Sequence, residues 1–336
     1  RGLIFVSPEP VSFGVGVVAL WLHKQLEATE IGHTALHGAY DGLPGAEGFA
    51  SKTFRWETPI DEESWRYGHN ARHHGATNVA GRDADIHFGP VRLTREVPWR
   101  PVHRWQLPFT LLVLFPNFAF TMNLHFTGVS DLVSGEEKLD FLPDRSPESR
   151  RLAWRRALRK FAPYYGLEYV LLPVIGALAG VGFVKVLLGN VLSEVMRDVY
   201  SAATIHCGHV GDEVASYPEG TRSHGRGEWY AMQVEASNNY TTSYPLSVLC
   251  GGLDHQIEHH LFPRLAPERL RQVAPEVQAA CARHGVTYRA APWGRTLVKA
   301  LRHIAQLGRP DPTPPSGARD GDAMASGPGA AVAAGG

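Results

Sequence analysis

The chain has 336 residues, and its 33 basic and 33 acidic side chains give a formal net charge of zero. A balanced charge excludes the strongly basic surface of a nucleic-acid-binding protein, and a hydrophobic content of 44% provides enough material for a sizeable core. The three cysteines, Cys207, Cys250 and Cys281, have no CxxC spacing, so they indicate neither a disulfide framework nor a thiolate zinc site. Histidine, with 17 copies, is the unusual residue.

Three apolar stretches are candidates for helices that cross a membrane, which takes about 20 residues. The first is residues 2–22, whose most apolar part, residues 11–22, reads equally well as a core helix of a soluble protein. Residues 105–122 contain no charged side chain but are interrupted by Pro116 and Asn117. Residues 169–189 carry a single charge, Lys185, and are the best candidate for a membrane span.

The third stretch is followed by the turn pair Gly189-Asn190, which predicts that residues 191–205 form the returning helix. This helix carries Glu194, Arg197 and Asp198, and charged groups at membrane depth are costly. We therefore expect these three side chains to face protein or water. For residues 105–122 we expect a re-entrant or interfacial segment, because a proline break suits such a segment better than a full span.

A basic cluster precedes the third stretch, and the positive-inside rule places it on the cytoplasmic side. Its members are Arg150, Arg151, Arg155, Arg156, Arg159 and Lys160. A solvated amphipathic helix would show the same pattern. The chain begins at Arg1 rather than Met, so we expect that an N-terminal piece is missing. From residue 309 onward Pro, Gly, Ala and Ser dominate, which predicts a domain over residues 1–308 and a disordered tail over 309–336.

Ten of the 17 histidines fall into four clusters, GHTALHG, HNARHHG, IHCGH and DHQIEHHLFP. Histidines four apart share one face of a helix, whereas adjacent histidines diverge by about 100°. An adjacent pair can therefore reach two neighbouring metal ions but can hardly chelate one. Imidazole suits iron, zinc, copper and nickel, and the scarcity of cysteine argues against an iron–sulfur cluster. The four clusters together predict a site that holds two metal ions.

The ordered set HxxxH, HNxxHH, TNxxGxDxD and QIEHHLFP resembles the membrane fatty acid desaturase family over roughly residues 20 to 270. The third box resembles the branch that contains front-end and linoleoyl-CoA-type desaturases. The resemblance implies an all-α integral membrane protein, with spanning helices and a cytoplasmic helical cap that carries the histidine boxes. It also implies a di-iron centre, ligated almost entirely by histidine, at the cytoplasmic ends of the spanning helices.

Carried over position by position, the resemblance implies a set of metal ligands, in which Gln256 stands where many relatives have a further histidine. His255, one residue earlier, has no counterpart, but it restores an HxxxHH spacing, so either residue can take that place. The expected ligands are His33, His37, His69, His73, His74, His209, His255, Gln256, His259 and His260. Candidates for the surrounding shell that orients the ligands are His206, Asp83, Asp85 and Glu258, and His125 is held open for the same role.

The function expected from this resemblance is an O2-dependent desaturation that places a cis double bond in a long fatty acyl chain, linked to CoA or lipid. Two iron ions form the cofactor, and an apolar tunnel fixes which carbon faces them. Electrons come from a separate ferredoxin or from cytochrome b5 with its reductase. If that electron donor is acidic, the arginines at 150–159 offer it a docking surface. The expected location is the membrane, with the active site on its cytoplasmic face.

Three alternatives remain open from the sequence. A fatty acyl or lipid hydroxylase would use the same scaffold and ligands, and only the product distinguishes it from a desaturase. A membrane metal transporter would carry its ligands near the middle of the spanning helices rather than at their ends. A soluble histidine-metal hydrolase is the third alternative, and the HExxH-type motif that it would carry is absent from the sequence.

Overall fold

The computed structural model describes residues 1–7, 9–133 and 139–311 of the chain, and most of these are helical. The prediction of an all-α protein is confirmed at this level. The described strands form two small pairs: β1 (His87–Phe88) lies antiparallel to β2 (Val91–Arg92), and β3 (Asn239–Thr241) lies parallel to β4 (Ala290–Pro292). The predicted tail lies outside the described residues from position 312 onward.

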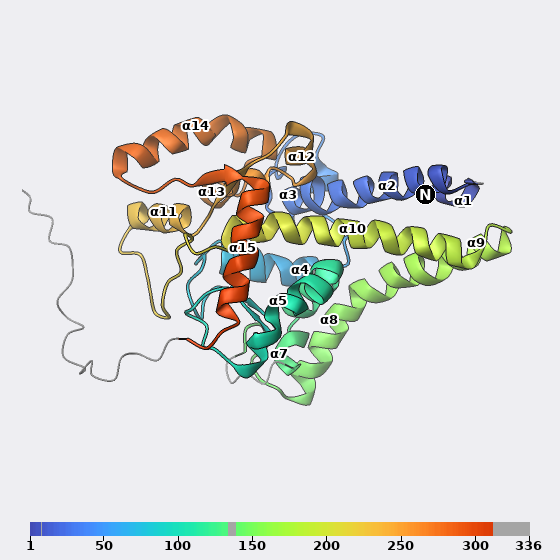
Figure 1. Cartoon of the computed structure of the whole chain (residues 1–336), viewed down its shortest axis with the longest axis horizontal. Helices are drawn as coiled ribbons and strands as arrows, with labels where there is room; N and C mark the ends of the chain where they lie inside the picture. The colour runs from blue at the N-terminus through green and yellow to red at the C-terminus, as the bar shows by residue number, and fades with distance from the viewer. Residues whose placement is uncertain (8, 134–138, 312–336) are drawn as a thin grey trace, which may run out of the picture.

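Long helices extend to one side of the molecule, and shorter helices gather at its other end (Figure 1). The long side consists of α1 (Gly2–Val6), α2 (Pro10–Leu26), α8 (Pro147–Tyr165), α9 (Leu172–Leu178) and α10 (Phe183–His209). The other end contains α11 (Arg226–Glu235), α12 (Tyr244–Leu249), η8 (Leu253–His255), α13 (Gln256–Leu261), α14 (Pro267–His284) and α15 (Trp293–Leu307).

The first two histidine boxes lie on helices with one widened turn each. Helix α2 continues into η1 (Glu27–His33) and α3 (Thr34–Leu36), and α4 (Glu62–Trp65) continues into η3 (Arg66–His73). Asp61 begins α4, because its side chain accepts a hydrogen bond from the amide of Ser64 at 2.9 Å. A short turn, η2 (Glu47–Phe49), lies between the two boxes.

Two helical segments of the described chain are long and apolar enough to cross a membrane. The first, Pro101–Phe126, joins η4 (Pro101–Trp105), α5 (Gln106–Phe109), η5 (Thr110–Leu114), η6 (Phe115–Asn117) and α6 (Phe118–Phe126), and α7 (Val129–Val133) follows it. The expected break at Pro116 and Asn117 is the tight turn η6, after which the helix continues. The re-entrant path stays a prediction.

The second segment, Pro147–Leu178, joins α8, η7 (Gly166–Leu171) and α9 into one helix of 32 residues. The prediction that residues 169–189 form a span and turn at Gly189-Asn190 is wrong. The chain instead turns just before α10, where Gly180 and Gly182 have φ angles of 74° and 104°, a backbone region that favours glycine. Helix α10 then runs unbroken for 27 residues to His209.

Gly189 is needed for packing rather than for a turn. A Cβ atom at this position would lie 2.8 Å from Cγ2 of Ile4, so the missing side chain lets α1 lie close against α10. The Asn190 amide donates to the Glu168 carbonyl at 2.6 Å, which ties α10 to the preceding helix of the hairpin. A glycine-asparagine pair therefore occurs here inside a helix because both residues serve contacts between helices.

The charged side chains of α10 are buried and paired, as the sequence predicts. Lys24 of α2 lies 3.2 Å from Glu168 and 3.1 Å from Glu194, and Arg197 lies 2.8 Å from Asp198. Removing one member of such a buried group costs several kcal/mol, since it leaves an uncompensated charge. The pair of Lys24 and Glu194 ties α2 to α10, and both helices lead into histidine boxes.

Candidate metal centre

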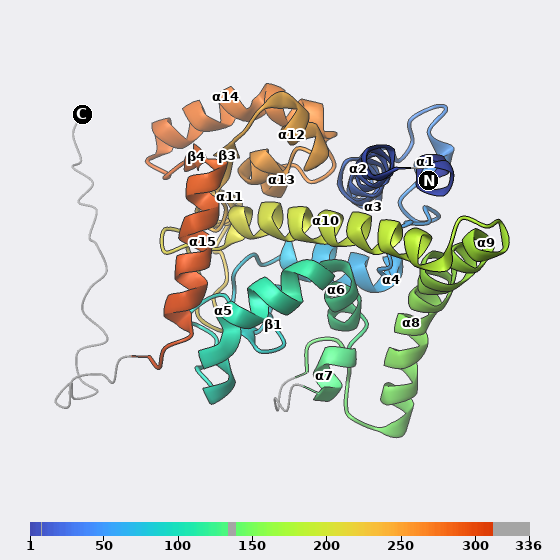
Figure 2. The same cartoon turned by 45° about the vertical axis from the view of Figure 1, so that its right-hand side comes forward.

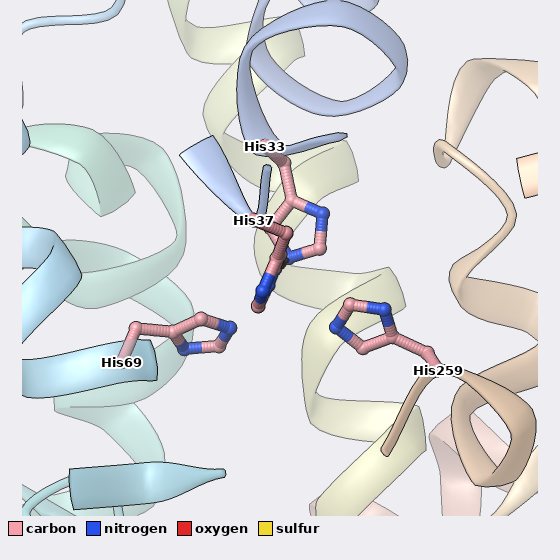
Figure 3. A group of neighbouring side chains, drawn as sticks. All are labelled: His33, His37, His69 and His259. Carbon is pink, nitrogen blue, oxygen red and sulfur yellow. Dashed lines mark hydrogen bonds between the residues drawn. The ribbon is translucent and has the colours of Figure 1, made fainter. Parts of the chain in front are cut away.

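The structure brings eight of the predicted histidines together from four segments of the chain. They come from the end of α2–η1, from η3, from the end of α10 and from α13, and they form two adjoining groups. The first group contains His33, His37, His69 and His259, whose candidate ligand atoms all lie within 4.8 Å of one another (Figure 3). The second contains His73, His209 and His260.

Within the first group the imidazole rings face a common centre. The Nε2 atoms of His33 and His37 are 3.2 Å apart, and the ring of His259 lies 4.6 Å from that of His37, centroid to centroid. His74 adjoins this group, because its Nε2 atom lies 3.3 Å from Nε2 of His69. Trp65 stacks on His69 with 4.5 Å between ring centroids and holds that ring in place.

The ring nitrogens of the second group lie equally close to one another. Nε2 of His209 lies 3.3 Å from Nε2 of His73 and 3.0 Å from Nε2 of His260. Gln256 joins this group with its Nε2 atom 2.7 Å from that of His209, while its Oε1 atom is buried without a hydrogen-bond partner among the described residues. The structure therefore places the Gln256 amide where its polar end faces the histidines.

Each adjacent histidine pair divides between the two groups, as the angular argument requires. His73 belongs to the second group and His74 adjoins the first, whereas His259 belongs to the first and His260 to the second. The widened turn η3 adds a detail that a regular helix lacks. The amide of His74 donates to the carbonyl of His69 at 3.0 Å, five residues earlier, which brings these two rings onto one face.

The outward nitrogens of four rings meet hydrogen-bond acceptors. Nδ1 of His73 lies 2.9 Å from Asp83, and Nδ1 of His69 lies 3.4 Å from Asp85. Nδ1 of His260 lies 3.0 Å from the Gln233 Oε1 atom, and Nδ1 of His209 lies 3.2 Å from a backbone carbonyl. A ring that donates its Nδ1 proton outward has its lone pair on Nε2, which points inward.

This arrangement fits metal ions. Lone pairs on Nε2 atoms 3.0 to 3.3 Å apart cannot hydrogen-bond to one another once the protons reside on Nδ1, and a cation between them removes that conflict. A set of neutral imidazoles is typical of iron, zinc, copper or nickel. The two groups thus offer two neighbouring positions for metal.

Asp83 holds the turn that lies beside the second group. Besides facing His73, its carboxylate accepts hydrogen bonds from the amides of Asn78 and Asp85, both at 2.8 Å. Asn78 has a φ of 55°, a left-handed conformation that asparagine tolerates better than most residues. The TNxxGxDxD motif therefore forms a buried turn whose carboxylates face His73 and His69.

Burial, reinforced by the neighbouring imidazoles, lowers the pKa of several rings well below the ordinary histidine value, among them His37, His74, His259 and His260. Burial also acts to lower the pKa of His73, but the Asp83 carboxylate outweighs it, so the pKa of His73 lies above its ordinary value. Most of the cluster is therefore neutral at neutral pH, which is the state that binds metal.

We expect the metal-free protein to lose stability as pH falls below about 6.5, the ordinary histidine pKa. Below that pH the four rings take up protons in the unfolded chain but stay neutral in the folded chain, so unfolding binds protons and acid favours it. The pKa of His73 is shifted in the opposite direction, so this ring acts against the trend, but it is one ring against these four. Thermal unfolding of the metal-free chain in detergent, measured from pH about 7.5 to about 5.5, checks this. A midpoint that rises as pH falls would contradict it.

Three predicted residues lie apart from both groups. His255 faces Asp254, with Nδ1 3.3 Å from the carboxylate. His206 donates from Nδ1 to the carbonyl of Ala202 at 2.8 Å, and its Nε2 atom is buried without a hydrogen-bond partner among the described residues. Glu258 points away from the rings, since it accepts hydrogen bonds from Asn239 at 2.7 Å and Tyr288 at 2.9 Å.

Two further contacts to the rings are absent from the predicted set of site residues. Gln233 of α11 and the hydroxyl of Thr77 both lie 3.0 Å from Nδ1 of His260. Thr77 belongs to the TNxxGxDxD motif and so has a sequence signal, whereas Gln233 has none. His125, which the sequence leaves open, has its Nε2 atom 3.5 Å from the Asp85 carboxylate and so lies one contact beyond His69.

An apolar cavity of about 110 Å³ adjoins both groups. His33 and His69 of the first group and His73 and His209 of the second line it. Its other walls are largely hydrophobic and include Ala119, Met122, Phe118, Phe126, Ile205 and Val210. An apolar space beside a few polar atoms is typical of a site for a small molecule with a hydrocarbon part.

The fold and site therefore define a helical protein in which two adjoining histidine groups that could hold metal lie beside an apolar cavity. Residues 10–292 match the model of the family described as fatty acid desaturase. Since this match covers most of the chain, the protein belongs to the fatty acid desaturase family. The prediction of an oxidoreductase that desaturates fatty acyl chains is confirmed at that level.

Named relatives are similar along most of the chain. It is 29% identical over 313 residues to the NADPH-dependent stearoyl-CoA 9-desaturase of Mycobacterium tuberculosis, covering 93% of this chain and 71% of that protein. It is 26% identical over 314 residues to the sn-1 linoleoyl-lipid 6-desaturase of Synechocystis, covering 91% of this chain and 84% of that protein. Human fatty acid desaturase 3 is 26% identical over 251 residues, covering 73% of this chain and 50% of that protein.

Proposed function

We propose that the protein is an O2-dependent desaturase that places a cis double bond in a long fatty acyl chain at a di-iron centre. The observation that carries the proposal is the convergence of Nε2 atoms from two histidine groups at the wall of an apolar cavity. Relatives named as acyl-CoA and acyl-lipid desaturases support the same chemistry, with the acyl group on CoA or on lipid.

The proposed iron ligands are the histidines of the two groups and their immediate neighbours. His33, His37, His69, His74 and His259 would hold one ion, and His73, His209, His260 and Gln256 the other. Bound iron supplies the O2-activating chemistry that no side chain can provide. Asp83, Asp85 and Gln233 keep the outward nitrogens protonated and the rings oriented. We leave His255 out of the ligand set, and Glu258 out of the groups that orient the ligands, because each faces another partner.

The reaction removes one hydrogen from each of two adjacent carbons and balances with two electrons from outside. The saturated chain, O2, two electrons and two protons give the unsaturated chain and two molecules of water. The chain's own residues contribute by holding the acyl chain: Phe118, Met122 and Ile205 exclude water and orient its methylene groups beside the histidines.

We further propose an integral membrane location with the metal centre on the cytoplasmic face. The two apolar helices, the exposed hydrophobic side chains along α8–α9 and the basic residues that precede them support this placement. Electrons would come from a ferredoxin, or from cytochrome b5 with its reductase. The mycobacterial relative is named as NADPH-dependent, which supports a reductase that takes electrons from NADPH and passes them to the donor.

Expression of the full chain in a host with a simple lipid profile tests the proposal. We expect a new unsaturated fatty acid, in which mass spectrometry locates one cis double bond, and no new product from a His73→Ala variant. A hydroxylated acyl chain would assign the same scaffold to a hydroxylase. The absence of any lipid product, together with exchangeable zinc in the purified protein, would favour a metal transporter.

A further inference from the structure

The basic cluster of α8 contains side chains with different surroundings. Arg159 is bound to the buried carboxylate of Asp61, and Lys160 lies 2.8 Å from Glu62, so both hold α8 against the start of the helix that carries the second histidine box. Arg151 and Arg155 are exposed, and neither has an ion-pair or hydrogen-bond partner among the residues that the structure describes. Arg151 and Arg155 are therefore free to meet another molecule.

Two exposed apolar side chains share the region of these free arginines. Trp154 is 47% exposed and Leu158 is 51% exposed. Arg151 and Arg155 are four residues apart on α8, as are Trp154 and Leu158, so both pairs lie on the outward side of the same turns. A surface that combines arginine with tryptophan and leucine suits the boundary between a bilayer and water. There the guanidinium groups reach water and lipid phosphates while the apolar side chains contact hydrocarbon.

The same helix continues into an apolar segment of the right length. Residues 147–178 form one helix, and its later turns expose Leu167, Val170, Leu171, Val174, Ile175 and Leu178. The hydrocarbon core of a bilayer is about 30 Å thick, or about 20 residues at 1.5 Å each. Counting back from Leu178, the core ends near Leu158, so Arg151, Trp154 and Arg155 fall in the headgroup layer.

We propose that the outward face of α8, formed by Arg151, Trp154, Arg155 and Leu158, binds the headgroups of anionic phospholipids. The proposal rests on the membrane location given above but not on the reaction or on the metal. Continuity with the exposed apolar turns favours a lipid over an acidic redox protein, because the arginines lie at the level of the lipid phosphates. Figure 2 shows α8 at the border of the molecule, with α11 and α14 on the opposite side.

The test compares lipid selectivity of matched variants of the full chain in nanodiscs. One variant is Arg151→Gln with Arg155→Gln, and its control is Arg269→Gln with Arg283→Gln, two exposed arginines of α14. The nanodiscs contain equal parts phosphatidylcholine and phosphatidylglycerol, and native mass spectrometry counts the lipids that stay bound. One arginine near an anionic surface is worth a factor of about five, so the α8 variant is expected to lose roughly tenfold or more of its preference for phosphatidylglycerol. The control should keep it.

Trp154→Phe adds a readout at the site itself. Brominated phosphatidylglycerol should quench more of the fluorescence of the parent protein than of this variant, if Trp154 lies among the headgroups. Unchanged lipid selectivity in the α8 double variant would overturn the proposal. If that variant instead turned over more slowly with an acidic electron donor in discs of phosphatidylcholine alone, the surface would belong to the donor. Lipid counting needs neither iron nor turnover, so it fails or succeeds independently of the desaturase proposal.

Discussion

Replacement of His259 by alanine is expected to abolish desaturation and to lower the bound iron, whereas replacement of His255 should change neither. The two residues are four positions apart in one short segment, but the ring of His259 faces His33 and His37 while that of His255 faces Asp254. Losing a group that only orients a ligand costs up to about a hundredfold in metal affinity or activity, so losing a ligand should cost more. Iron analysis and product yield on the same purified samples measure both effects.

His255→Ala is the matched control, because it removes an imidazole from the same box and tests whether the box tolerates that change. A His259→Ala protein that keeps full iron and activity would remove His259 from the proposed centre. Equal losses of iron and activity in the two variants would instead mean that His255 serves as a ligand. Gln256 would then be removed from the proposed ligand set.

Enlarging Ala119 to phenylalanine is expected to block turnover without loss of iron. Ala119 is buried at the cavity wall, and its amide is held by Asp198 at 3.2 Å, so a larger side chain there has to enter the cavity. Overpacking typically costs 1–3 kcal/mol of stability, which most folded domains survive. We expect kcat/KM for a long acyl chain to fall by roughly tenfold to a hundredfold, since the chain can no longer lie beside the histidines.

The control for this variant is Ala162→Phe, the same enlargement at an exposed position of α8. It should leave iron content and turnover unchanged. An Ala119→Phe enzyme with full activity on long acyl chains would show that the substrate lies elsewhere. A variant that lost iron together with activity would show that this wall supports the metal centre rather than the substrate.

The sequence was sufficient to predict the helical class, the family and the histidines that meet. The spacing of HNARHHG and EHH predicts that neighbouring histidines point to different ions, and the structure divides both pairs in that way. The choice between His255 and Gln256 was not available from spacing, because η8 ends at His255 and α13 begins at Gln256, so the two side chains leave the backbone in different directions. A regular helical period does not extend across that junction.

The position of the hairpin turn was misjudged for a related reason. Gly189-Asn190 and Gly180–Gly182 are both plausible turns by residue type, and contacts such as that of Gly189 with Ile4 distinguish them. Such a contact joins residues far apart in sequence and leaves no local signal. His206 shows the same limit, because the three-residue spacing to His209 leaves open whether both rings face one centre, and its Nδ1 atom bonds to Ala202 instead.

Metal analysis of the purified full chain, combined with X-ray absorption at the iron edge, tests the account most directly. The histidine groups predict about two irons per chain that survive dialysis, with a first coordination sphere dominated by nitrogen and free of sulfur. One iron or fewer in fully folded protein, or zinc that exchanges freely in its place, would contradict a binuclear iron centre built from these imidazoles.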